Sequence, residues 1–191
     1  MIETPLSLLN RLRRKPGDQP SWRRLTTLYA PLIRRWLLQQ DTPESDVDDL
    51  TQEVLLALTR DLADFDHNGR KGAFRHWVRS ITTNRLRGYW RNRRSGPLNG
   101  LEVRLAQLED PSSELCLLWD REHDEYIARR LMELIEPEFA LSTWRSFQLL
   151  VLEERPAAAV AEQLGLSVNA VLIAKSRVLR RLRQEGRGLI G

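Results

Sequence analysis

Apolar residues recur at spacings of three and four along most of this chain, and no segment alternates apolar and polar residues as a strand would. Trp22, Leu25, Tyr29, Leu32 and Trp36 form the clearest of these series. Such spacing gathers the apolar side chains on one face of a helix, and that face must pack against another element. The chain is therefore predicted to be all-α.

Periodic segments predict helices at 22–37, 46–58, 73–93, 113–136, 141–152, 156–164 and 168–183. Pro31 is expected to break or kink the first of them, because proline lacks a backbone donor and clashes with the preceding turn. Residues 96–112 combine Gly, Pro, Asn and Ser and are typical of a linker. The pattern therefore predicts two helical parts on either side of a connection.

Composition excludes several classes of protein. Of the 191 residues, 29% are charged and the mean hydropathy is −0.45, and no apolar run approaches the roughly 20 residues of a membrane span. Near the N-terminus the basic residues follow the apolar stretch, so no secretory signal is expected. The single cysteine, Cys116, excludes an internal disulfide and a multi-cysteine metal site, and fits a reducing, cytoplasmic setting.

The net charge of +4 conceals a segmentation along the chain. Residues 1–95 carry a net +7, residues 96–154 carry −8 and residues 155–191 carry +5. The first segment divides again, into nine acidic residues within 41–66 and nine basic residues, with no acid, within 70–94. Aromatic residues interrupt the basic run, which favours a surface for phosphates and bases, with a solvated amphipathic helix as the alternative.

Residues 156–183 have the spacing of a helix-turn-helix. Ala161 is small where the second helix must cross, Gly165 suits the positive φ of the turn, and Ser167 is placed to cap the second helix. A shared core is predicted for Val160, Leu164, Leu166, Val171 and Ala174. The polar face of the second helix would enter the major groove of DNA, and the alternative is a helical hairpin that docks on protein.

Three motifs, in this order, resemble a known family. Residues 48–55, DDLTQEVL, resemble the D-L-x-Q-E-V-F signature of bacterial sigma-70 region 2, and residues 74–86, FRHWVRSITTNRL, resemble the F-R-x-W-L-x-x-I-A-x-N stretch after it. Residues 174–182, AKSRVLRRL, are similar to the end of sigma region 4. Together they resemble RNA polymerase sigma factors of the extracytoplasmic-function (ECF) type, over about 20–95 and 125–185.

A weaker motif lies between the two regions. Residues 142–147, STWRSF, resemble the T-W-x-A-F stretch of planctomycete ECF members. The family resemblance implies a sigma region 2 bundle at 1–95 and a region 4 helix-turn-helix at 126–191, joined by a linker at 96–125. The acidic linker would then run near the RNA exit path and mimic nucleic acid.

The resemblance also implies partners. They are the RNA polymerase core, through its β′ clamp and β flap, and promoter DNA, and the resemblance allows for an anti-sigma factor. No enzymatic activity, cofactor or metal is implied. Core binding would fall to Asp49, Leu50, Gln52 and Glu53 on the acidic helix.

The −10 element would be melted, with its bases held on aromatic and polar side chains of the basic helix and the loop before it. The residues assigned to this contact are Asn68, Arg70, Lys71, Asn84, Arg85, Gly88, Tyr89, Trp90, Arg91, Arg93 and Arg94. Trp77 is assigned to the core instead.

The −35 element would be bound as duplex by the second helix of the helix-turn-helix. The residues assigned to it are Ser167, Asn169, Ala170, Lys175, Ser176, Arg177, Arg180 and Arg181. Leu172 and Ile173 depart from the polar residues of many family members. Either this turn does not read bases directly, or it makes an extra contact with a protein.

Two other classes of protein stay open at this point. A helix-turn-helix regulator would bind intact duplex without polymerase. A DNA-processing enzyme would use carboxylates of 41–66 with a divalent metal, although no His stands at ligand spacing and no catalytic triad, phosphate loop or HExxH motif is present.

Overall fold

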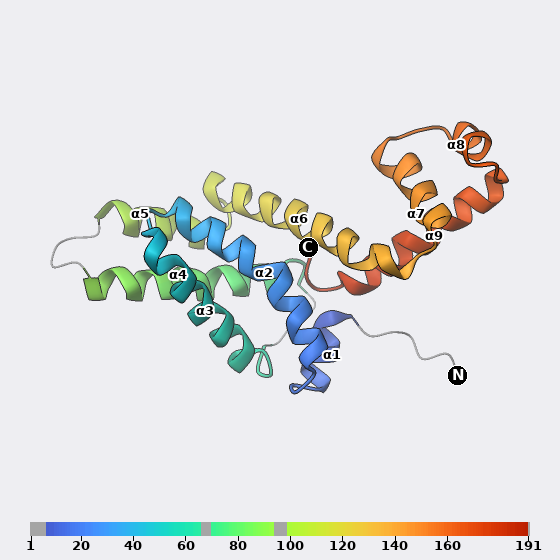
Figure 1. The fold of residues 1–191 in the computed structure, drawn as a ribbon. Helices are drawn as coiled ribbons and strands as arrows, with labels where there is room; N and C mark the ends of the chain where they lie inside the picture. Colours follow the sequence, from blue (N-terminus) through green and yellow to red (C-terminus); the bar gives the residue numbers. More distant parts are fainter. Residues whose placement is uncertain (1–6, 66–69, 94–98, 191) are drawn as a thin grey trace.

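The computed structural model describes residues 7–65, 70–93 and 99–190, and within these ranges it contains helices and no strand, which confirms the all-α class (Figure 1). The helices are α1 (Leu8–Arg14), α2 (Gln19–Gln39), α3 (Glu44–Asp61), α4 (Ala73–Arg93), α5 (Asn99–Glu109), α6 (Glu114–Ile135), the 3-10 helix η1 (Glu136–Glu138), α7 (Leu141–Phe147), the π-helix η2 (Gln148–Leu152), α8 (Ala157–Leu164) and α9 (Val168–Glu185). In this described part no single helix combines the length and apolar composition needed to cross a membrane; only α8 and α9 taken together, bent by 104°, do so.

The helices form two lobes joined by α6 (Figure 1). The first lobe consists of α1 to α5 and the N-terminal part of α6, and its core is built mainly from α2, α3 and α4. Tyr29 and Phe74 are fully buried at its centre, with ring centroids 5.5 Å apart in an edge-on arrangement that suits two aromatic rings. Trp77 packs against this core from a partly buried position, as predicted.

The expected break at Pro31 is wrong, because α2 continues through this residue to Gln39. Proline removes one hydrogen bond from the helix, but the turns on both sides of it bury large side chains, including Tyr29, Leu32 and Ile33. Packing of this face against α3 outweighs the local loss. The apolar periodicity on either side of Pro31 was therefore the better guide to α2.

The stretch predicted as a linker is largely helical. Residues 99–109 form α5, which buries Leu105 and Leu108 completely and packs against α4 and α6. The next helix, α6, begins after its cap Ser113 and runs on without a break across the predicted domain border at 125/126. The flanking Gly and Pro residues hid α5, whereas the two leucines three residues apart were the signal for it.

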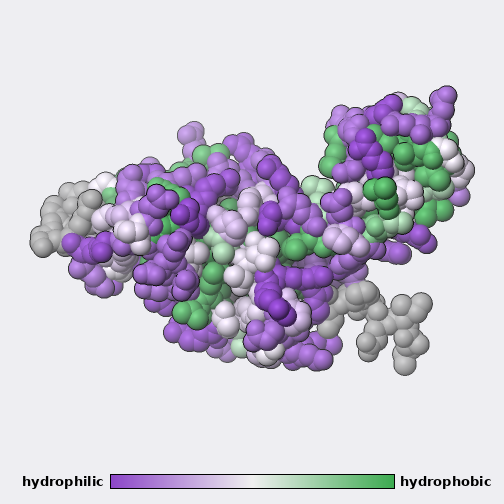
Figure 2. All heavy atoms as spheres, in the orientation of Figure 1, coloured by the Kyte–Doolittle hydropathy of each residue, from purple (hydrophilic) through white to green (hydrophobic). Residues whose placement is uncertain are grey.

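The second lobe is smaller and contains the end of α6, together with η1, α7, η2, α8 and α9. Trp144 and Phe147 of α7 pack on Ile135 and Val178, so the aromatic residues of the 142–147 motif belong to the core. Figure 2 shows mostly hydrophilic residues on the visible face of the first lobe, whereas hydrophobic residues are exposed over the second lobe.

Candidate functional site

The helix-turn-helix predicted in the C-terminal segment is formed by α8, a short turn and α9 (Figure 1). Gly165 ends α8 in the left-handed region, at φ 64°, and the backbone N–H of Leu166 donates to the carbonyl of Ala161 at 2.9 Å. Ser167 caps α9, since its hydroxyl accepts from the N–H of Ala170 at 3.1 Å. The turn chemistry is as expected, but Leu166 is 36% exposed rather than part of the shared core.

The two faces of α9 differ sharply in their surroundings. Val171, Ala174 and Val178 are buried against the rest of the lobe. The opposite side carries a solvent-facing stripe, which we call the α9 stripe and which consists of Asn169, Leu172, Ile173, Ser176, Arg177 and Arg180. Four of the residues predicted to contact the −35 element therefore lie together, and the two aliphatic residues lie among them.

The other predicted −35 residues do not lie on this stripe. The hydroxyl of Ser167 is engaged as the helix cap, and Ala170 and Lys175 are half-buried. Arg181 binds two carboxylates of this chain, with Nε 2.6 Å from Glu138 and Nη1 2.8 Å from Glu185. Its side chain is held within the protein, so we correct its expected role from DNA contact to structural contact.

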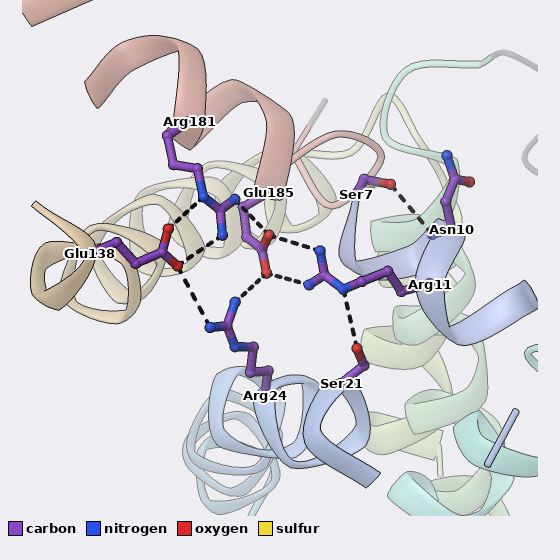
Figure 3. A network of polar contacts seen from close by, with 8 residues as sticks. All are labelled: Ser7, Asn10, Arg11, Ser21, Arg24, Glu138, Arg181 and Glu185. Carbon is purple, nitrogen blue, oxygen red and sulfur yellow. Dashed lines mark hydrogen bonds and ion pairs between the residues drawn. The ribbon is translucent and has the colours of Figure 1, made fainter. Parts of the chain in front are cut away.

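Arg181 belongs to a network of charged residues around the C-terminal end of α9 (Figure 3). Glu185 is 1% exposed and accepts hydrogen bonds from Arg11 of α1 at 2.6 Å and from Arg24 of α2 at 3.0 Å, besides that from Arg181. Arg24 also pairs with Glu138 at 3.6 Å. The network joins three segments far apart in sequence and connects the two lobes.

A carboxylate at a helix C-terminus lies at the negative end of the helix dipole and needs compensation. Burial by itself would raise the pKa of Glu185, but the hydrogen bonds from Arg11 and Arg181 outweigh it and lower that pKa to about 2. Glu185 is therefore ionised at neutral pH, and its charge depends on these arginines. Sequence reasoning missed this network because its members are separated by up to 174 residues.

The basic helix predicted for the −10 element is α4, with the exact bounds expected. Asn84 and Arg91 are exposed and Arg85 and Gly88 are half-exposed, and Arg70 and Lys71 are exposed before the helix. Asn68 and Arg94 lie outside the described residues. Among those that are described, Arg70, Lys71, Arg85 and Arg91 take part in no ion pair, so these four cationic groups are available to a ligand.

The last turns of α4 are more constrained than predicted. The hydroxyl of Tyr89 donates to Asp46 of α3, and Arg93 pairs with the same carboxylate. The bond from Tyr89, with smaller effects of Ser45 and Arg93, lowers the pKa of Asp46 below its ordinary value. Asp46 thus connects α3 to α4.

Trp90 lies on the core side of α4, one turn after the buried Leu86, and is only 9% exposed. Its ring meets Tyr89 edge-on, with centroids 5.1 Å apart. In this structure the indole cannot offer a face to a base, and the stacking role expected of it is therefore corrected to a packing role. Tyr89 is half-exposed and is the aromatic group that lies nearer to the surface.

Two further arginines of α4 are used inside the first lobe. Arg79 is 3% exposed and pairs with Asp120 of α6, and Arg75 pairs with Asp120 at 3.1 Å and with Asp124 at 2.5 Å. Asp124 in turn contacts His123, whose Nε2 lies 3.1 Å from the hydroxyl of Tyr29. The basic run thus fixes α6 against α4.

Arg87 faces α5, the helix found in the predicted linker. Its Nε donates to Glu102 and both Nη atoms donate to Glu109, each at 3.2 Å. Its Nη1 also donates to the amide oxygen of Asn84 at 3.1 Å. The helix α5 therefore covers one cation beside the predicted −10 surface.

The acidic helix α3 presents a distinct exposed face. Asp49, Gln52 and Glu53 are exposed, and in the described part of the chain neither carboxylate takes part in an ion pair. Leu50 is 3% exposed and belongs to the core, so its expected role in core binding is corrected. Sequence reasoning missed Leu56, which is 69% exposed and lies one turn beyond Gln52 and Glu53. We call Asp49, Gln52, Glu53 and Leu56 the α3 face.

Other acids near the start of α3 are occupied by arginines. Arg34 of α2 bonds Asp48 at 2.9 Å and Glu44 at 3.4 Å. No group of three or more His, Cys, Asp or Glu side chains in the described ranges is arranged to hold a metal ion. The contrast with Asp49 and Glu53 shows that the free carboxylates of α3 are confined to one face.

Comparison with known proteins gives a family match for part of the chain. Residues 25–96 match the family model described as Sigma-70 region 2, so this segment of the first lobe is similar to region 2 of sigma-70 factors. No curated protein matches the chain. A solved structure of CnrH in complex with the cytosolic domain of CnrY is similar at 22% identity and a TM-score of 0.39, with 92% of each chain covered. At so low a TM-score the likeness does not bear on function, and nothing in these matches supports the planctomycete type.

Proposed function

We propose that this chain is a sigma factor of the ECF type, which binds the RNA polymerase core in the cytoplasm and directs initiation at promoters with −10 and −35 elements. The observation that carries the proposal is that one chain combines a match to sigma-70 region 2 with a helix-turn-helix whose second helix has a solvent-facing side. In this assignment region 2 extends over 1–95 and region 4 over 126–191, and the connection at 96–125 contributes α5 and the start of α6.

The α3 face is the proposed contact with the polymerase core. It combines two unpaired carboxylates, an amide and a leucine that is largely exposed, which suits a protein partner with complementary charge and an apolar contact. The neighbouring acids Asp46 and Asp48 are bound to arginines of this chain. Within α3, Asp49 and Glu53 are thus the acidic residues that are open to a partner.

The −10 contact is proposed for the exposed side of α4, through Asn84, Arg85 and Arg91. Arg70 and Lys71, which come just before the start of α4, would add to it. Four unpaired cations can neutralise phosphates, and the amide of Asn84 can hydrogen-bond a base edge.

The −35 contact is proposed for the α9 stripe, which lies on the other lobe and whose amide, hydroxyl and guanidinium groups suit the major groove.

The test is binding and transcription with core polymerase. Asp49→Ala combined with Glu53→Ala is expected to weaken core binding about tenfold or more and to reduce promoter-dependent transcription, because both free carboxylates of the α3 face are lost. Glu125→Ala with Glu162→Ala is the matched control, since it removes two other exposed carboxylates from α6 and α8. Affinity is measured by titrating labelled core polymerase, and folding by circular dichroism.

Three results would change the proposal. If the wild-type chain forms no complex with core polymerase even at low salt, the sigma-factor function is wrong. Specific binding to duplex in the absence of polymerase, with no such complex, would establish the helix-turn-helix regulator instead. An equal loss of core binding in the control pair would show that general acidity, and not the α3 face, makes the contact.

A further inference from the structure

The α9 stripe has an unusual composition for a surface expected to face DNA. Its positions follow spacings of three and one along the helix, so all six side chains line the same shallow hollow. At its centre Leu172 is 44% exposed and Ile173 is 47% exposed. An amide lies on the N-terminal side of this pair, and Arg177 and Arg180 lie on the C-terminal side.

The aliphatic pair is not part of any core in the described structure. Val171 and Ala174, which flank it in sequence, point inward and are buried, so a helix with two good core positions also places two large apolar side chains outward. Val168, one turn before Leu172, is also 44% exposed. Figure 2 shows the same tendency, with hydrophobic residues at the surface of this lobe.

The charges around the pair indicate what covers it. Lys175, Arg177, Arg180 and Arg183 lie on the same helix, and among the described residues none of them is in an ion pair. An apolar strip flanked by free cations matches the major groove, in which phosphates border the base edges. The only apolar group exposed on base pairs in that groove is the 5-methyl group of thymine.

We propose that Leu172 and Ile173 are specificity determinants that recognise thymine methyl groups in the duplex bound by α9. This inference rests on the proposed function and extends it, because it states which bases the −35 duplex contains opposite the central turn of α9. Asn169 and Ser176 would then hydrogen-bond to neighbouring base edges, and the two arginines would bind guanine or phosphate. Each methyl group contacted should raise the affinity about fourfold.

The experiment removes the methyl groups from the DNA and the aliphatic groups from the protein. The full chain, alone and with core polymerase, selects binding sites from a randomised duplex library, and the enriched duplex is then made with deoxyuridine in place of each thymidine in turn. Wild-type affinity should fall about fourfold at one or two positions. Leu172→Ala with Ile173→Ala should bind the thymidine duplex more weakly and should lose the distinction between the two bases at those positions.

Leu141→Ala serves as the protein control, because Leu141 is 82% exposed on α7 and lies outside the α9 stripe. It should retain both the affinity and the discrimination between thymidine and deoxyuridine. Because deoxyuridine changes the DNA alone, its effect on the wild-type chain does not depend on whether any variant folds.

The outcomes separate the inference from the function on which it rests. An enriched duplex whose affinity is the same with thymidine and deoxyuridine at every position overturns the methyl contact and leaves the sigma-factor function intact. A double variant that keeps full affinity and discrimination also overturns it, and assigns the pair to a protein contact. If no duplex is enriched under either condition, the proposed function and this inference fail together.

Discussion

The helices α4 and α9 carry similar runs of basic residues, but they use them differently. In α4 the arginines at 75, 79, 87 and 93 are bound to acids of α3, α5 and α6. In α9, Arg181 is the one basic residue with an ion pair among the described residues, and the remaining four are free. A count of charges therefore overestimates the number of free cations on α4, whereas it describes those of α9 well.

The largest effect that this comparison predicts is on the free energy of unfolding. Arg79→Gln should reduce the free energy of unfolding by about 3 kcal/mol, because it leaves Asp120 without its closest cation and removes a guanidinium that lies 5.4 Å from the ring centroid of Trp119. Arg177→Gln, on the exposed stripe of α9, should change it by less than about 0.5 kcal/mol. Urea denaturation measures both, and equal effects would show that the two helices do not differ as described.

The second test concerns Arg181, the cation of α9 that is bound internally, and changes its partner Glu185. Glu185→Gln should destabilise the protein by about 3 kcal/mol at pH 7, because the carboxylate has a pKa of about 2 in the folded state against an ordinary value of 4.5. A lowered folded pKa stabilises the protein above pH 4.5, and this contribution disappears as the pH falls through 2. The difference between wild type and variant should therefore shrink between pH 5 and pH 2.

The control for this test is Glu162→Gln, which removes an exposed carboxylate that has no ion pair in the described structure. Its unfolding free energy should follow that of the wild type at each pH. A difference between wild type and Glu185→Gln that stays constant from pH 7 to pH 3 would contradict the assignment of the charge at Glu185 to the network of Arg11, Arg24 and Arg181.

The sequence predicted local features well and long-range partners poorly. The bounds of α4, the cap Ser167 and the positive φ of Gly165 follow from neighbouring residues, and the structure has each as predicted. The errors have a common origin, because Leu50 and Trp90 were assigned to surfaces by their position in a motif, whereas helix packing turns both inward. No motif shows which face of a helix is covered until its neighbours are known.

The same limit applies to charges. Acidic character in 96–154 was predicted, but not that Glu102 and Glu109 bind Arg87, or that Asp120 binds the buried Arg79. Ion pairs between helices depend on the packing of the lobes, and the residues involved are 15 to 41 positions apart. The surfaces left for partners are those where this internal pairing is incomplete, namely the α3 face, part of α4 and the α9 stripe.

The smallest expected effect concerns Arg87, the cation of α4 that pairs with α5. Glu102→Gln with Glu109→Gln removes both carboxylates that pair with it, which are about half exposed, at 47% and 45%. Exposed ion pairs of this kind contribute about 0–1 kcal/mol, so the fold should be retained. The freed guanidinium adds one phosphate contact beside Asn84, and binding to single-stranded DNA should become about threefold tighter at low salt, with a salt slope steeper by about 0.7. Glu125→Gln with Glu162→Gln changes the net charge equally but leaves Arg87 paired, so an identical gain in that control would mean that α5 acts through overall charge and does not mask a DNA-binding residue.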